Sequence, residues 1–139
     1  MRVPEYLSHK PIVAVDNYDR IDGKYANNSD AKALSLGKAQ WSDDENIEIS
    51  AKVWRHTGGK WSRQSEELPL HRVLDLNILI LSSMMIKKDN NLSKTNLDEV
   101  ILNESDNKIL EKFLDENQEY LKPRIRELKR ILNEINLED

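Results

Sequence analysis

The stretch from residue 46 to residue 64 constrains the fold most, because its hydrophobic pattern and a glycine pair together specify a β-hairpin. Alternate positions before the glycines are apolar: Ile47, Ile49, Ala51 and Val53. A period of two places alternate side chains on opposite faces of a strand. Gly58-Gly59 follow and supply the positive φ angles of a two-residue hairpin turn. The sequence predicts a 46–64 hairpin with its apolar residues on the core side.

Helical spacing of apolar residues predicts a central helix over about 69–86. Pro69 suits the first turn of that helix, where the missing N–H is not needed. Ser29 is a candidate N-cap for an earlier helix ending near residue 40, and Ser105 is one for a helix over about 106–117. The last predicted helix carries a heptad-like stripe, formed by Leu121, Ile125, Leu128, Leu132 and Ile135. The stripe either packs on its own domain or forms a dimer seam.

Together these elements predict an α+β fold. A small antiparallel sheet contains the 46–64 hairpin and is packed by the central helix, and two helices follow toward the C-terminus. A chain of 139 residues fits one domain with one core. We expect a single domain over 1–139, with an α+β core over 1–88 and a helical extension over 89–139.

Composition excludes several classes of function. The net charge of −4 and the 25 acidic against 21 basic residues argue against general nucleic-acid binding, which needs a surplus of positive charge. The chain has no cysteine, so thiolate metal sites and cysteine nucleophiles are excluded. The three histidines lack metal-site spacing, and we expect neither metal nor cofactor. The start of the chain has no apolar signal core and no apolar run is long enough to span a bilayer, which favours a cytoplasmic protein.

The segment WRHTGGKWSRQSEELPLHR, residues 54–72, concentrates aromatic and charged groups. With the glycines in the turn, Trp54 and His56 lie opposite Arg63 and Trp61 and share the non-core face with them. Three interpretations of that face are open: a second layer covers it, it binds a planar anion by stacking and charge, or it is a solvent-exposed interface patch. The predicted ligand-binding residues are Lys52, Trp54, Arg55, His56, Lys60, Trp61, Arg63, His71 and Arg72.

Two stretches carry a resemblance to a known group of proteins. DNYDRIDGKYANNSDAKALSLGKAQW and ISAKVWRHTGGKWSRQSEELPLHRVLDL resemble a family of short, uncharacterised bacterial proteins, over about residues 10–80. The family has no known activity, so the resemblance implies neither a catalytic residue nor a cofactor. It implies that roughly the first 80 residues form a unit.

Three functions compete at this point. The first is a small non-catalytic protein that binds an anionic, nucleotide-like ligand, with sequestration of a nucleotide signal in phage or bacterial defence as one setting. The second is a metal-independent hydrolase or phosphodiesterase that uses His56 or His71, with Glu66, Glu67 or Asp75 as the orienting carboxylate. The third is an interaction module that forms homo-oligomers through its C-terminal helices.

Overall fold

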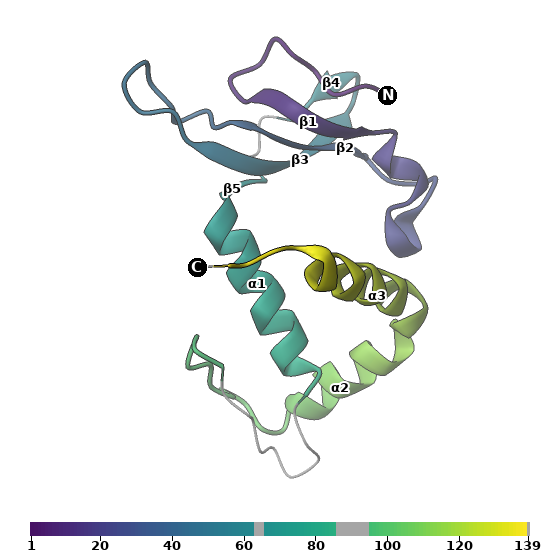
Figure 1. Ribbon diagram of the computed structural model, residues 1–139. Coiled ribbons are helices and arrows are strands. Elements are labelled where there is room, and N and C mark those ends of the chain that lie inside the picture. The colour runs from purple at the N-terminus through teal and green to yellow at the C-terminus, as the bar shows by residue number, and fades with distance from the viewer. Residues whose placement is uncertain (63–65, 86–94, 139) are drawn as a thin grey trace. The chain divides into compact units, whose positions relative to one another are not determined.

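The computed structural model describes residues 1–62, 66–85 and 95–138. Its residues group into two compact units, Met1–Asn77 and Ile78–Asp139, and each is described by itself. An antiparallel sheet in the first unit and helices in the second confirm the α+β prediction (Figure 1). The division into a core over 1–88 and an extension over 89–139 stays a prediction.

The first unit is built on one antiparallel sheet, in the order β1-β2-β3-β4, with β5 also paired to β3. Its strands are β1 (Lys10–Asp16), β2 (Ala31–Lys38), β3 (Ile49–Thr57), β4 (Lys60–Trp61) and β5 (Glu67–Pro69). Two short 3-10 helices, Tyr18–Arg20 and Gly23–Tyr25, lie in the connection between β1 and β2.

The predicted hairpin is confirmed as β3 and β4. Gly58 and Gly59 form its turn with φ angles of 62° and 80°, and His56 pairs with Trp61 as the two-residue loop requires. The predicted return strand extends further, to Gln64, but residues 63–65 lie outside the described residues.

The helix predicted after Ser29 is wrong, because residues Ala31–Lys38 form strand β2. Small side chains at alternate positions explain the strand: Ala31, Ala33, Ser35 and Gly37 are buried, whereas the residues between them are half-buried or exposed. This period of two outweighs the helix propensity of alanine. The hydroxyl of Ser29 accepts a hydrogen bond from the Ala31 N–H at 2.9 Å, a local turn that does not cap a helix.

The assignment of the core side of β3 is also wrong. Ile47 and Ile49, predicted to face the core, are exposed, whereas Ser50 and Trp54 on the opposite face are fully buried. The small residues of β2 lie beside Trp54, since Ala33 is its register partner, and leave room for the indole. The Ser50 hydroxyl and the Trp54 indole N–H are buried on this face because each has a hydrogen-bond partner.

Gly37 allows β1 and β2 to approach closely. A β-carbon at Gly37 would overlap the carbonyl oxygen of Lys10 and would lie 2.7 Å from the Cα of Pro11. Both contacts are with backbone, which cannot rotate away as a flexible side chain would. We therefore expect Gly37→Ala to lower the free energy of unfolding by about 2–3 kcal/mol, measured by urea denaturation.

Gly58→Ala is the matched control for Gly37→Ala. A β-carbon at Gly58 meets nothing within 4 Å, although the φ of 62° strains it. We expect a smaller loss, of about 1 kcal/mol. Equal losses in the two variants would contradict the steric explanation for Gly37.

Helices make up most of the second unit, and the helical predictions for this part of the chain are confirmed. The central helix is α1 (Leu70–Ser83), whose first turns belong to the first unit, and α2 (Asn107–Glu116) and α3 (Gln118–Glu134) follow. In the predicted stripe, Leu121 and Ile125 are half-buried, whereas Leu128, Leu132 and Ile135 are exposed. Oligomerisation through this stripe stays a prediction. Within the described ranges, no helix has the length and apolar character needed to cross a membrane.

Candidate functional site

The aromatic residues of the hairpin contact one another. Trp54, which is 0% exposed, makes edge-to-face contacts with His9 and Trp61, at 5.6 and 5.8 Å between ring centroids. Trp61 in turn contacts His56 edge to face at 5.0 Å. The interpretation in which this face is covered therefore holds for Trp54. The cover comes from the segment that carries His9.

Two predicted cations of β3 are engaged within the first unit. The Lys52 ammonium lies 4.1 Å from the ring centroid of Trp54, and burial lowers the pKa of Lys52 while the charge of Glu67 opposes that shift. On the other face, Arg55 binds Asp30 at 2.8 Å and Glu66 at 3.1 Å. Hydrogen bonds from Arg55 and Thr57 hold the pKa of Asp30 below its ordinary value. Lys60 is exposed at the hairpin turn, and Arg63 lies outside the described residues.

A buried polar network lies under the hairpin and centres on His9. The His9 Nδ1 atom is 3.0 Å from Glu67 Oε1 and 2.9 Å from Ser50 Oγ, and Nε2 is 2.9 Å from Ser35 Oγ. Trp54 Nε1 donates to Ser35 Oγ at 2.8 Å, and Ser50 Oγ donates to Glu67 Oε1 at 2.7 Å. All five residues are less than 9% exposed, so they form one dehydrated unit.

Hydrogen-bond chemistry fixes the direction of this network when His9 is neutral. The ionised Glu67 carboxylate is an acceptor only, so the Nδ1 atom of a neutral His9 carries the proton and donates it to Glu67 Oε1. Nε2 then accepts from Ser35 Oγ, which in turn accepts from the indole N–H of Trp54. Burial acts to raise the pKa of Glu67, but hydrogen bonds from Ser50, the Gln40 backbone and His9 outweigh burial and lower it. The result is a directed chain that ends on an ionised carboxylate.

The Ser35–His9–Glu67 arrangement has the connectivity of a serine–histidine–acid triad, but its burial indicates a structural role. A nucleophilic serine must meet a substrate, whereas Ser35 is 5% exposed and His9 is 1% exposed. The network joins a residue before β1 to β2, β3 and β5. Sequence reasoning missed it because its members are spread over 59 positions and no local spacing marks them.

A second feature of the first unit is a cavity of about 620 Å³ that we call the Trp41 cavity. Its lining residues come from the β2–β3 loop, β3, β5 and the start of α1: Trp41, Glu48, Ile49, Glu67, Pro69, Leu70, His71 and Arg72. Trp41 is 42% exposed, and its indole N–H donates to the Glu48 carboxylate. This hydrogen bond orients the indole and leaves its faces for packing.

The cationic side of the Trp41 cavity comes from α1. Arg72 and His71 are exposed and line the cavity. Counting only the residues with a described position, Arg72 has no ion-pair partner. An indole, a guanidinium and an imidazole thus meet at one cavity. Stacking and charge-assisted hydrogen bonding are both available to a ligand there.

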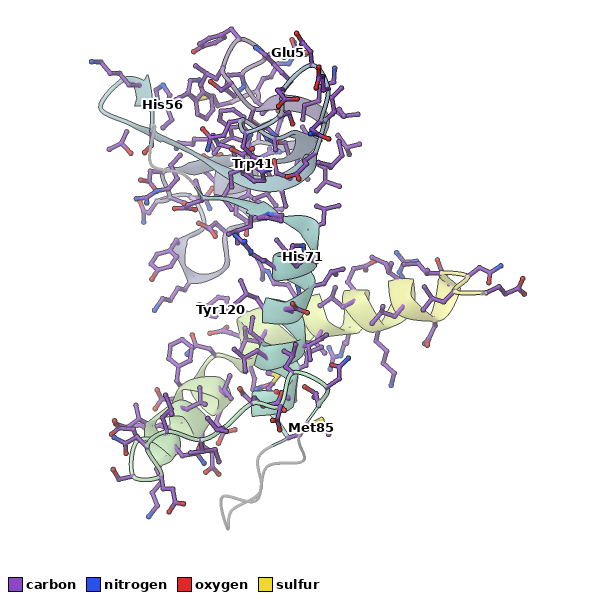
Figure 2. The ribbon with its side chains drawn as sticks, turned by 90° about the vertical axis from the view of Figure 1, so that its left-hand side faces the viewer. Glu5, Trp41, His56, His71, Met85 and Tyr120 are labelled. Atoms are coloured by element: carbon purple, nitrogen blue, oxygen red, sulfur yellow. The ribbon has the colours of Figure 1, made fainter. Side chains whose placement is uncertain are left out.

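The structure divides the predicted site residues between two places. Figure 2 shows His56 on the hairpin and His71 on α1. His71 and Arg72 line the Trp41 cavity, whereas His56 contacts Trp61. Two of the carboxylates predicted to orient a histidine are engaged elsewhere, with Glu66 on Arg55 and Glu67 on His9. Sequence reasoning did not select Trp41. Its separation from Pro69 by 28 positions hid the fact that both line one cavity.

Comparison with known proteins supports a family relationship and no function. No curated protein and no solved structure matched the chain. One family model matches residues 1–137, which extends well beyond the 10–80 range of the resemblance found in the sequence. The chain therefore belongs to DUF6530, a family of unknown function.

Proposed function

We propose that this protein binds an anionic, nucleotide-like small molecule in the Trp41 cavity. The observation that carries the proposal is the meeting of a half-exposed indole with Arg72 and His71 at one cavity of about 620 Å³. That volume lies in the range of small-molecule sites. This proposal places the ligand at the junction of β5 and α1. The sequence had indicated the hairpin face, where the aromatic rings instead contact one another.

Each part of a nucleotide has a counterpart in this cavity. A planar base stacks on the Trp41 indole, which Glu48 holds through its N–H. A phosphate group meets the Arg72 guanidinium, which presents several N–H donors in a plane, and the His71 imidazole adds a further donor. The carboxylate of Glu48 accepts hydrogen bonds from sugar hydroxyls. Sequestration of a nucleotide signal, as in phage or bacterial defence, requires only such binding.

Titration calorimetry with mono-, di- and cyclic nucleotides tests the proposal. At least one nucleotide is expected to bind the wild-type protein, and both Trp41→Ala and Arg72→Gln are expected to weaken it about tenfold or more, through lost stacking and lost charge. Arg126→Gln on α3, an exposed residue, makes the same charge change and is expected to bind as the wild type does. The proposal would be contradicted if no nucleotide gave a heat of binding, or if all variants bound with equal affinity.

The hydrolase alternative narrows to His71, because His71 lines the Trp41 cavity whereas His56 contacts Trp61. General acid–base catalysis would need His71 to reach a bound phosphoester. Product formation during the same titrations, abolished by His71→Ala, would favour this enzyme over a non-catalytic binding protein.

A further inference from the structure

One face of the sheet in the first unit is apolar and exposed, and we call it the valine face. It consists of two rows of register partners across β1, β2 and β3, Val13–Leu36–Ala51 and Val15–Leu34–Val53. Val13 is 62% exposed, and a cavity of about 480 Å³ lies over the two rows. Single exposed apolar residues are ordinary, but a contiguous apolar surface of this kind indicates a binding surface.

One end of the valine face carries two lysines directly opposite each other. Lys10 of β1 pairs in register with Lys38 of β2, and directly opposed residues project on the same side of a sheet. A break in register between Pro11 and Val13 produces this alignment. Like charges in this position destabilise a strand pair. In the described part of the chain, neither amine has an ion-pair partner, so an external anion would relieve the repulsion.

The opposite end of the valine face is electrically compensated. Lys32 lies 3.4 Å from Asp19, and Arg55 is held by Asp30 and Glu66 at 2.8 and 3.1 Å. Uncompensated positive charge is therefore present at the Lys10–Lys38 end. The surface is polarised along the strands: from the Lys10–Lys38 pair to the far apolar row, which contains Leu34, is a distance of four residues along β2, or roughly 13 Å.

We infer that the valine face binds a free, single-chain amphiphile with an anionic head group, such as a medium-chain fatty acid. The carboxylate lies between the ammonium groups of Lys10 and Lys38, and the acyl chain lies along the rows of Val13 and Val15 toward Val53. Charge complementarity selects the head group, and the apolar cavity selects the tail. This site shares no lining residue with the Trp41 cavity and does not rest on the proposed nucleotide binding.

Calorimetry with dodecanoate, below its micelle concentration, tests this inference on the full chain. The wild-type protein is expected to bind dodecanoate, and each methylene removed from the chain is expected to weaken binding by up to about fourfold. The double variant Lys10→Gln/Lys38→Gln is expected to weaken binding about tenfold or more, because it removes both charge-assisted contacts. Both lysines are exposed, so this variant keeps the fold.

A matched control separates the site from general charge. Lys108→Gln/Lys112→Gln makes the same charge change on exposed positions of α2 and is expected to leave dodecanoate binding unchanged. Three results would overturn the inference: no binding of dodecanoate, binding that ignores chain length, or equal loss in the two double variants. Capture of the protein by anionic phospholipid vesicles without binding of free dodecanoate would also overturn it, in favour of a membrane surface.

Discussion

Replacing His9 with alanine is expected to lower the free energy of unfolding by about 3–5 kcal/mol at neutral pH. His9 is 1% exposed and hydrogen-bonds Ser35, Ser50 and Glu67. Its removal leaves a cavity and withdraws a partner from three buried polar groups at once. Urea denaturation followed by circular dichroism measures the change.

Two further variants isolate the cause of that loss. His56→Ala removes a half-buried imidazole that contacts only Trp61 among the described rings, and its cost should stay below about 1 kcal/mol. His9→Asn retains a donor near the position of Nδ1 and should recover about 1 kcal/mol of the loss, roughly one hydrogen bond. If His9→Ala were no more costly than His56→Ala, the network would not be a stabilising element.

Sequence patterns correctly predicted the elements that are determined by residues close together in the chain. The hairpin was predictable because Gly58 and Gly59 dictate the turn, and the helices were predictable because apolar spacing and Pro69 mark them. The helix predicted after Ser29 is wrong because the small residues that alternate in β2 make room for Trp54 on the paired strand β3. The sequence around β2 does not show which residue lies opposite it. Tertiary packing overrode propensity there.

The core side of β3 was not predictable from hydrophobicity alone. Burial of the face with Ser50 and Trp54 depends on hydrogen-bond partners far away in the sequence, among them His9, which lies 41 positions before Ser50. The same reasoning applies to the candidate site. His71 and Arg72 were predicted because they lie in a segment rich in functional groups. Trp41 lines the same cavity because the chain returns through β3 and β5, and no spacing in the sequence indicates this.

Glu67→Gln is expected to have the second large effect. It should lower the free energy of unfolding by about 2–4 kcal/mol at neutral pH, because it removes charge-assisted hydrogen bonds inside the network. The pKa of Glu67 in the folded protein lies below its ordinary value of 4.5. Its stabilising contribution is therefore complete above pH 4.5 and is lost as the pH falls through the folded value. The gap in stability between wild type and Glu67→Gln should consequently narrow below pH 4.5, measured by urea denaturation at a series of pH values.

Glu66→Gln is the neighbouring control, because Glu66 pairs with Arg55 at a partly exposed position, where ion pairs contribute about 1 kcal/mol or less.

The double variant His9→Ala/Glu67→Gln decides whether the network acts as a unit. Once His9 is gone, Glu67 has already lost one of its donors, so the second change should cost less than it does alone, with a coupling of about 0.5–3 kcal/mol. Additive losses would mean that the carboxylate stabilises the sheet independently of the imidazole. A gap between wild type and Glu67→Gln that stays constant with pH would mean that the charge of Glu67 is not the source of its stabilising contribution.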